Sequence, residues 1–152
     1  MRDLPLSLSG RSALDVAVDA VQQAGSLLRE RFHTAKTVSY KGPSNLVTDV
    51  DLLAEEQLRD NFARKFPDIG FLGEESGGQE SDAGLRWIVD PIDGTRNYAL
   101  GVPHFAVSVA LASGPDVLVG VTYDPVRDET FQAVRGEGAF LDGVRLSVTE
   151  RI

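Results

Sequence analysis

The spacing of the apolar residues changes at Pro67 from a helical period to a strand-like one. Before Pro67, apolar side chains recur every three or four positions over residues 12–32 and again over residues 49–66, which is typical of amphipathic helices. After Pro67, short apolar runs alternate with turn sequences. Two helices followed by a set of strands are therefore expected.

Both predicted helices carry start signals of the same kind. Ser12 and Asp15 have the spacing of a capping box, in which the first side chain accepts a hydrogen bond from the helix backbone. Thr48 and Asp51 repeat this spacing at the second helix. Pro67 is expected to end the second helix, because proline lacks the backbone N–H that a helix needs.

The predicted strands follow one another closely. Strands are expected over residues 69–72, 85–89, 105–112, 117–123, 130–134 and 145–148. Turn pairs such as Asp124-Pro125 separate the later runs and leave no room for helical crossovers, so these strands should pair antiparallel. The polar, glycine-rich residues 77–84 are expected to form a mobile loop. The predicted fold class is α+β, with two amino-terminal helices packed on a mainly antiparallel sheet.

The composition limits the kinds of metal site and partner. The 152 residues include no cysteine and two histidines, which excludes disulfides and thiolate zinc sites and leaves oxygen ligands for any metal. A net charge of −8 without a cluster of Lys and Arg argues against nucleic-acid and anionic-membrane surfaces. Residues 1–10 contain no continuous apolar run that could serve as a signal peptide or membrane span. One domain over residues 1–152 and a cytoplasmic location are expected.

Acidic residues gather in pairs at the ends of predicted elements. The pairs are Asp49 with Asp51, Glu74 with Glu75, and Asp90 with Asp93. Helix capping would account for the first pair, and ordinary turns would account for the other two. The third pair has a special setting, because the apolar residues 87–89 should deliver Asp90 to the end of a core strand. An unpaired carboxylate is costly there unless cations or hydrogen-bond donors compensate for it.

The third pair also suits a particular chemistry. Two carboxylates on a tight turn, with a backbone carbonyl between them, could supply oxygen ligands to Mg²⁺. Gly94 would let the backbone approach a phosphate, and Thr95 would place a hydroxyl where it could orient a water. Leu53 and Ala54 occupy positions that an EF-hand loop would need for ligands and glycine, so calcium sensing is not expected.

Residues 87–98, Trp-Ile-Val-Asp-Pro-Ile-Asp-Gly-Thr-Arg-Asn-Tyr, closely resemble the signature of the inositol monophosphatase family of magnesium-dependent phosphatases. Two similar segments precede it in the expected order, at residues 45–51 and 73–76, and residues 136–143 resemble the family's paired-strand segment. The resemblance implies the fold of the first domain of that family.

The resemblance also implies a set of metal ligands. Glu74, Asp90 and the carbonyl of Ile92 would hold a first Mg²⁺. Asp90 would bridge to a second Mg²⁺ that Asp93 also holds. Asp51 would bind a weaker third ion or its waters.

The same resemblance implies roles for neighbouring residues. Asp51 and Thr95 would activate the attacking water as the catalytic pair. The backbone amides of Gly94 and Thr95 would receive phosphate oxygens. Glu75 would support the ligands from behind, and Lys41 would lie near the site.

The implied activity is magnesium-dependent hydrolysis of a small phosphorylated metabolite, with inositol monophosphate as the default substrate. Full-length members of the family continue with a further α/β part, which this chain lacks after Ile152 and which would complete the second metal site. The competing hypothesis is a non-catalytic fragment that keeps the fold and part of the metal binding. Apolar faces left by the absent part predict self-association, most simply as a homodimer.

Overall fold

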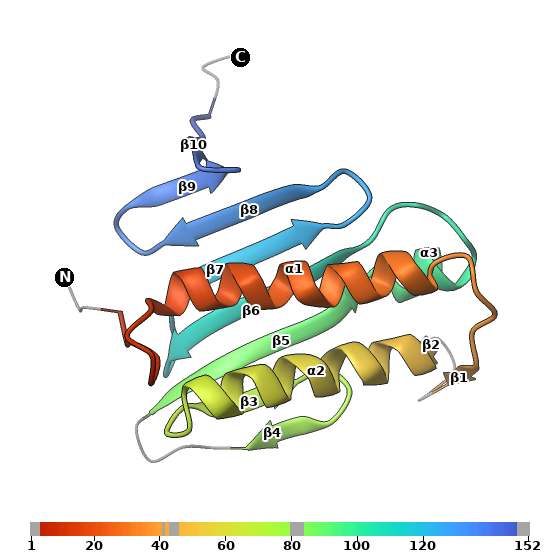
Figure 1. The fold of residues 1–152 in the computed structure, drawn as a ribbon, viewed down its shortest axis with the longest axis horizontal. Coiled ribbons are helices and arrows are strands. Elements are labelled where there is room, and N and C mark those ends of the chain that lie inside the picture. The colour runs from red at the N-terminus through yellow and green to blue at the C-terminus, as the bar shows by residue number, and fades with distance from the viewer. Residues whose placement is uncertain (1–3, 41, 43–45, 80–83, 149–152) are drawn as a thin grey trace.

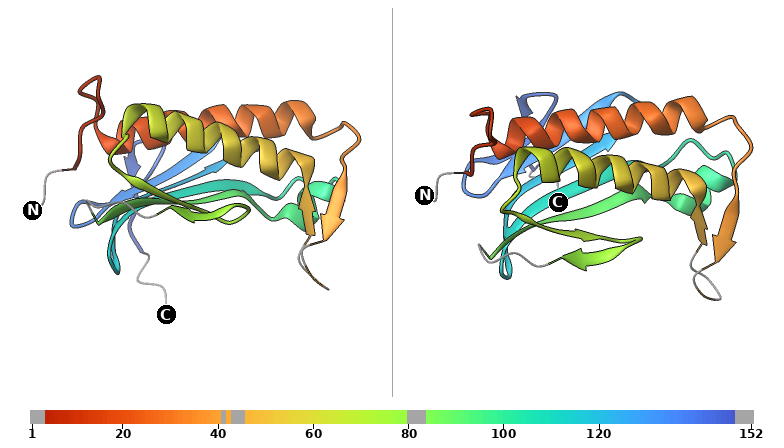
Figure 2. Two further views of the ribbon diagram at one scale, coloured as in Figure 1. Left: turned by 90° about the horizontal axis from the view of Figure 1, so that it is seen from below. Right: turned by 60° about the horizontal axis from the view of Figure 1, so that its bottom comes forward.

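Two long helices lie side by side across one face of a large β-sheet, as Figures 1 and 2 show. This arrangement comes from a computed structural model that describes residues 4–40, 42, 46–79 and 84–148. The helices are α1 (Ala13–Arg31) and α2 (Asp49–Lys65), and a short helix, α3 (Thr95–Ala99), follows one of the central strands. Within the described residues, no helix has the length and apolar character needed to cross a bilayer.

The two long helices begin where the sequence predicts. The Ser12 side chain accepts a hydrogen bond from the backbone N–H of Asp15, and α2 begins with a complete capping box between Thr48 and Asp51. Helix α2 ends two residues before Pro67. Helix α3 was not predicted, because five residues are too few to show a helical period.

Among the described residues, the main sheet has eight strands in the order β10-β9-β8-β7-β6-β5-β3-β4. Their bounds are β3 (Gly70–Gly73), β4 (Gly77–Gln79), β5 (Leu85–Asp93), β6 (Ala106–Ser113), β7 (Asp116–Asp124), β8 (Glu129–Val134), β9 (Gly138–Leu141) and β10 (Val144–Arg145). Strands β3 and β5 pair in parallel, and every other pairing in this sheet is antiparallel. The predicted α+β class with a mainly antiparallel sheet is confirmed.

Two strands lie outside the main sheet. Strand β1 (Val38–Tyr40) pairs antiparallel with β2 (Leu46–Thr48), which leads directly into α2. The sequence did not predict them, because β1 is exposed along its whole length and lacks the alternation that marks a half-buried strand.

The prediction of a mobile loop over residues 77–84 is wrong at its start. Gly77–Gln79 form β4, whose backbone pairs with β3 in the register Gly73↔Gly77 and Leu72↔Gly78. Glycine-rich segments have low strand propensity, but a tight turn that follows a strand can bring the backbone back into register. Residues 80–83 of the predicted loop lie outside the described residues.

The strand predicted over residues 145–148 is also wrong in its bounds. The observed strand is β10, Val144–Arg145, and it pairs with β9. Residues 146–148 are exposed and lie outside the sheet. Leu146 and Val148 are therefore exposed in spite of their apolar side chains.

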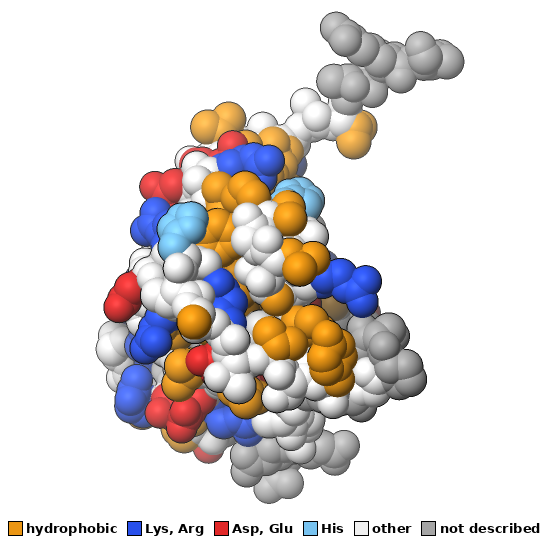
Figure 3. All heavy atoms as spheres, turned by 90° about the vertical axis from the view of Figure 1, so that its right-hand side faces the viewer, with side chains coloured by type: hydrophobic (Ala, Val, Ile, Leu, Met, Phe, Trp, Pro, Cys, Tyr) orange, Lys and Arg blue, Asp and Glu red, His pale blue; other side chains and the backbone are white. Residues whose placement is uncertain are grey.

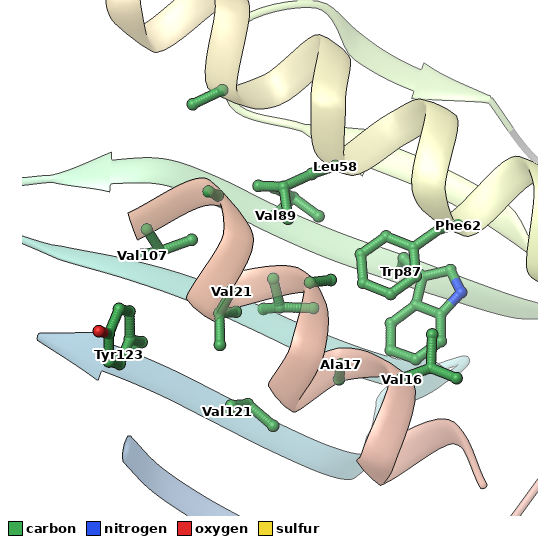
Figure 4. Packing of buried hydrophobic residues seen from close by; sticks show 14 of the residues in the cluster. Val16, Ala17, Val21, Leu58, Phe62, Trp87, Val89, Val107, Val121 and Tyr123 are labelled. Atoms are coloured by element: carbon green, nitrogen blue, oxygen red, sulfur yellow. The ribbon is translucent and has the colours of Figure 1, made fainter. Parts of the chain in front are cut away.

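The core lies between the helices and the sheet, where Val16 and Val21 of α1 belong to one cluster of buried residues with Val121 of β7 (Figure 4). The ring of Phe62 on α2 stacks on Trp87 of β5, with ring centroids 4.1 Å apart and an interplanar angle of 15°. Both side chains are almost completely buried. This stack joins α2 to the strand that carries the predicted metal ligands.

Replacing Phe62 by alanine should lower the free energy of unfolding by about 3–5 kcal/mol, because a large buried ring is lost and a cavity remains. Leu53 lies on the same helix and is 41% exposed, so Leu53→Ala is the matched control and should cost about 1 kcal/mol or less. Urea denaturation of the two variants measures the difference. Equal losses would mean that the stack does not stabilise the fold.

Candidate metal and phosphate site

The predicted ligands of β5 lie on a β-bulge. Asp90 pairs with Ser108 and Asp93 pairs with Ala106, so a step of three residues on β5 faces a step of two residues on β6. A bulge of this kind bends the strand and changes the direction of its side chains. Ile92 donates its backbone N–H to Oδ1 of Asp90 at 3.1 Å. Because of the bulge, β5 extends to Asp93 instead of ending at the predicted position 89.

Parallel pairing of β3 with β5 places Glu74 beside Asp90. Gly73 is in register with Val89, and the backbone N–H of Glu74 donates to the carbonyl of Val89 at 3.1 Å. The residues that follow these two positions therefore meet at one edge of the sheet. Glu74 and Asp90 line the same hollow, and Glu74 is close enough to raise the pKa of Asp90. The structure thus brings together two of the predicted ligands that come from different strands.

The carboxyl groups at this edge repel one another. The pKa of Asp90 is raised to about 8, first by burial, then by the hydrogen bond and charge of Glu74, and further by the charge of Asp93. A carboxyl group with this pKa retains its proton at neutral pH. A divalent cation could take the place of that proton, because hard cations prefer carboxylate and carbonyl oxygens.

The acidic residues fit a divalent cation by their chemistry, although they are not gathered around one point. Across the described residues, no three acidic or histidine side chains stand close enough together to form a finished metal-binding group. Asp93 is exposed at the end of the bulge. A cation would have to draw the carboxylates together against the repulsion that raises the pKa of Asp90.

Without a divalent cation, the free energy of unfolding should fall as the pH rises from about 4 to about 8. Folded Asp90 holds its proton up to about pH 8, whereas the unfolded residue releases it near its ordinary value of 3.8. The unfolded state therefore binds fewer protons in this window, so stability decreases with pH. The expected loss is a few kcal/mol. Urea denaturation at several pH values with a chelator present measures it, and a slope that Asp90→Asn leaves unchanged would contradict the assignment.

Asp51 and Thr95 form a second cluster beside the bulge. Asp51 lies in the first turn of α2, is 1% exposed, and accepts a hydrogen bond from the backbone N–H of Thr48 at 2.8 Å. The Thr95 hydroxyl lies 2.9 Å from Oδ1 of Asp51 and 2.9 Å from the carbonyl oxygen of Ile92. Burial raises the pKa of Asp51, and the hydrogen bonds from Thr48 and Thr95 offset part of that rise. The two residues of the predicted catalytic pair are therefore in contact.

The neighbouring Asp49 has a structural role. Its Oδ1 accepts a hydrogen bond from the backbone N–H of Thr37 at 2.9 Å, and its own N–H donates to the carbonyl of Thr37 at 3.0 Å. Asp49 therefore ties the start of α2 to the segment before β1.

Gly94 links the bulge to α3 and needs to be glycine. Its φ of 101° lies in the left-handed region, and a Cβ at this position would lie 3.0 Å from the carbonyl oxygen of His104. Helix α3 begins at the next residue, Thr95, so the first backbone N–H groups of this turn have no partners within the helix. These groups include the amides that the resemblance assigns to phosphate oxygens.

Two side chains that sequence reasoning missed hold α3 in place. Asn97 donates to the carbonyl of His104 at 2.8 Å, and the Tyr98 hydroxyl donates to the carbonyl of Leu28 in α1 at 2.8 Å. Tyr98 is completely buried, and burial raises the pKa of its hydroxyl. An asparagine and a tyrosine two and three residues after Thr95 are the sequence signal that could have indicated these anchors.

Of the remaining predicted residues, Glu75 lies in the turn after β3. Glu75 is half-buried, and its backbone N–H donates to the side chain of Glu55 in α2. Glu55 was not predicted, because an acid on a helix is usually assigned to the exposed face. Lys41 lies outside the described residues.

Two hollows flank the bulge. One has a volume of about 430 Å³ and is lined by Glu74, Asp90 and largely apolar groups of β3, β5 and β6. The other has a volume of about 330 Å³ and is lined by Asp93, Gly94 and neighbours that include His104. Figure 3, which views the end of the molecule where α3 lies, shows hydrophobic side chains and both histidines on this face, with charged groups among them. The predicted site therefore opens to both sides of the bulge.

The chain is similar to known proteins in both sequence and structure. Residues 11–151 match the family model described as "Inositol monophosphatase family". The chain is 45% identical to "Inositol-1-monophosphatase" of Rhizobium meliloti over 147 residues, which cover 93% of the chain and 54% of the relative. It is 42% identical to "Nus factor SuhB" of Escherichia coli K12 over 136 residues, which cover 88% of the chain and 51% of the relative.

Solved structures show the same likeness. The extragenic suppressor protein suhB from Bartonella henselae matches with a TM-score of 0.87 and 41% identity, covering 90% of this chain and 54% of that structure. An IMPase from Thermotoga maritima matches with a TM-score of 0.84 and 34% identity over the same shares of the two chains. The chain spans about half the length of the curated relatives it matches. On the family match, the identities and the shared fold, this chain belongs to the inositol monophosphatase family.

Proposed function

We propose that this chain carries the metal-binding and water-activating part of a magnesium-dependent phosphatase that hydrolyses a small phosphate monoester. The observation that supports this most strongly is the meeting of two clusters at the bulge. Glu74 and Asp90 meet at one side, and Asp51 and Thr95 meet at the other. The Ile92 carbonyl lies 2.9 Å from the Thr95 hydroxyl, and the Ile92 N–H donates to Asp90, so Ile92 contacts both clusters.

In this proposal the metal ligands are Glu74, Asp90, the Ile92 carbonyl and Asp93, with Asp51 at a weaker site. Magnesium ions held there would neutralise the phosphate, lower the pKa of a water and stabilise the leaving oxygen. The acidic chain could thus hold an anionic substrate although it has a net charge of −8.

The protein's own groups would position the water and the phosphate. The Thr95 hydroxyl has one proton and two nearby acceptors, the Asp51 carboxylate and the Ile92 carbonyl. Its oxygen can therefore also accept a hydrogen bond from a water, which would fix the direction of that water. Thr95 would pass its own proton to Asp51 as it takes one from the water, and the amides of Gly94 and Thr95 would bind phosphate oxygens. Glu75 and Lys41 would lie near the metal ligands and support them without binding the metal themselves.

The proposed default substrate is an inositol monophosphate, supported by the name of the Rhizobium meliloti relative. We also propose a cytoplasmic homodimer that does not bind nucleic acid. The negative charge supports the lack of nucleic-acid binding, and exposed apolar side chains such as Leu100 and Val102 support self-association. Light scattering of the purified chain tests the dimer.

Phosphate release tests the activity. The purified chain is incubated with inositol 1-phosphate and other monoesters, with Mg²⁺ or with a chelator, while calorimetry measures Mg²⁺ binding separately. Magnesium-dependent release that exceeds the chelator control supports the proposal. Magnesium binding without any release would favour the competing hypothesis of a non-catalytic protein that keeps the fold and part of the metal binding. Neither binding nor release would contradict the proposed site altogether.

A further inference from the structure

Glu55 is a buried carboxylate on α2 directly behind the turn that follows β3. It is 2% exposed, and a charge at such a position is costly unless hydrogen bonds compensate for it. Its Oε2 accepts from the backbone N–H of Glu75 at 2.7 Å, and its Oε1 accepts from the backbone N–H of Ser76 at 2.9 Å. The Ser76 hydroxyl also donates to Oε1. Both oxygens of Glu55 are therefore used to hold one turn.

Arg59 compensates the charge of Glu55 and joins it to β3. Its guanidinium lies one helical turn further along α2, with Nη2 3.5 Å from Oε1 of Glu55. The same guanidinium lies over the ring of Phe71 in β3, 4.4 Å from its centroid. Hydrogen bonds to ionised groups are stronger than those between neutral groups, and burial strengthens them further. The charged hydrogen bonds of Glu55 therefore hold the turn after β3 strongly against α2.

The turn and the helix also approach each other closely. A Cβ at Gly73 would lie 2.4 Å from the carboxyl carbon of Glu55. Side-chain ends can often move away from such a clash, but Glu55 is fixed by three donors from the turn. Glycine at position 73 therefore allows the carboxylate to lie directly against the backbone of the strand end.

Glu74 lies between the two points at which this segment is fixed. On one side its own N–H is bonded to the carbonyl of Val89, and on the other side the next two N–H groups are bonded to Glu55. Its side chain is exposed and lines the same hollow as Asp90. The backbone that carries Glu74 thus has little freedom, while its side chain lies at the hollow that Asp90 also lines.

We propose that Glu55 is a positioning residue for the metal site, because it fixes the turn that presents Glu74 to the cation. This inference rests on the proposed function, since it assumes that Glu74 binds Mg²⁺. A glutamine at position 55 keeps the size of the side chain but replaces one acceptor oxygen by an NH₂ group. That group would face a backbone N–H or the Ser76 hydroxyl, so at least one of the bonds to the turn is lost.

The variant Glu55→Gln should bind Mg²⁺ about 10-fold more weakly than the parent chain, as expected when a group that orients a ligand is lost. NMR titration can follow binding up to high Mg²⁺ concentrations and measures it even when it is weak. Hydrogen exchange should become faster at the amides of Glu75 and Ser76 and stay unchanged in the core. Glu56→Gln is the matched control, because Glu56 is the exposed neighbour on the same helix, and it should bind Mg²⁺ like the parent.

A double-mutant cycle separates positioning from a general loss of structure. If Glu55 acts through Glu74, the substitution Glu55→Gln should cause no further loss of Mg²⁺ affinity in a Glu74→Ala background. The milder variant Ser76→Ala keeps Glu55 and removes one of its donors, so it should fold and show a smaller loss, which Ser76→Thr should restore. This series carries the test if Glu55→Gln does not fold.

The possible outcomes are distinct. If the parent chain binds Mg²⁺ and Glu55→Gln binds it equally well, the inference is wrong while the proposed function stands. An equal loss in the parent and in the Glu74→Ala background would also overturn it, because Glu55 would then act independently of Glu74. If the parent chain binds no Mg²⁺, the proposed function fails and the inference fails with it.

Discussion

Replacing Asp90 by asparagine should weaken Mg²⁺ binding by roughly 100-fold or more and lower the rate of phosphate release by about 1000-fold, which corresponds to about 4 kcal/mol of transition-state stabilisation. Asparagine keeps the shape of the side chain but supplies one neutral carbonyl oxygen in place of a charged carboxylate. In the proposed site, Asp90 would touch both principal ions, so this substitution removes charge from each of them.

The same variant should be more stable than the parent chain when metal is absent. At pH 8 the carboxyl of Asp90 is close to its pKa of about 8, and ionisation brings it into repulsion with Glu74 and Asp93. Asparagine has no charge, so the repulsion disappears and the melting temperature should rise in the presence of a chelator. Lower metal affinity together with higher metal-free stability is a combination that damage to the fold cannot produce.

Asp60→Asn is the control for this experiment, because Asp60 lies exposed on α2 and undergoes the same chemical change away from the bulge. It should leave Mg²⁺ affinity, phosphate release and melting temperature close to those of the parent. If Asp90→Asn and Asp60→Asn behave alike in calorimetry and in the phosphate assay, Asp90 is not a metal ligand.

The two long helices could be predicted from the sequence because their signals are local. The capping spacing at Ser12 and at Thr48 gave the correct start of each helix, and Pro67 marked the end of the second one. The same local rules fail where pairing with a neighbouring strand determines the secondary structure. Strand β4 contains two glycines and a glutamine, and it is a strand because the turn after Gly73 returns the backbone to β3.

The candidate site depends on contacts that hydrophobic spacing alone does not reveal. Glu74 lies beside Asp90 because β3 and β5 pair in parallel, and no pattern of apolar residues specifies that pairing. Likewise, Asp51 and Thr95 are 44 residues apart. From the residues alone, the three acidic pairs could be read as one helix cap and two turns. Their grouping was predicted through the resemblance of residues 87–98 to a known family.

Glu55 shows a different limit of sequence reasoning. It lies next to Ala54 on α2, and both residues are buried. Sequence reasoning normally places an acidic side chain of such a helix on the solvent-exposed face, because buried carboxylates are rare. The partners that make its burial favourable are two backbone N–H groups and a hydroxyl in another element, and backbone groups leave no signal in the sequence.

Replacing Thr95 by alanine should lower kcat by roughly 100-fold, while the affinity for Mg²⁺ stays within about 3-fold of the parent value. The Thr95 hydroxyl lies 2.9 Å from the Asp51 carboxylate and 2.9 Å from the Ile92 carbonyl, so its removal takes away the group that would hold the water against Asp51. The proposed ligands Glu74, Asp90 and Asp93 keep their carboxylates, which is why binding should persist.

Thr95→Ser retains the hydroxyl and should restore most of the rate. Thr34→Ala is the control, because Thr34 is exposed and its hydroxyl donates only to the nearby carbonyl of Arg31 among the bonds described for it. Steady-state phosphate release gives kcat, and calorimetry gives the affinity for Mg²⁺. An unchanged kcat in Thr95→Ala would remove the hydroxyl from the mechanism, and a parallel loss of Mg²⁺ binding would mean that Thr95 acts on the metal site instead of on the water.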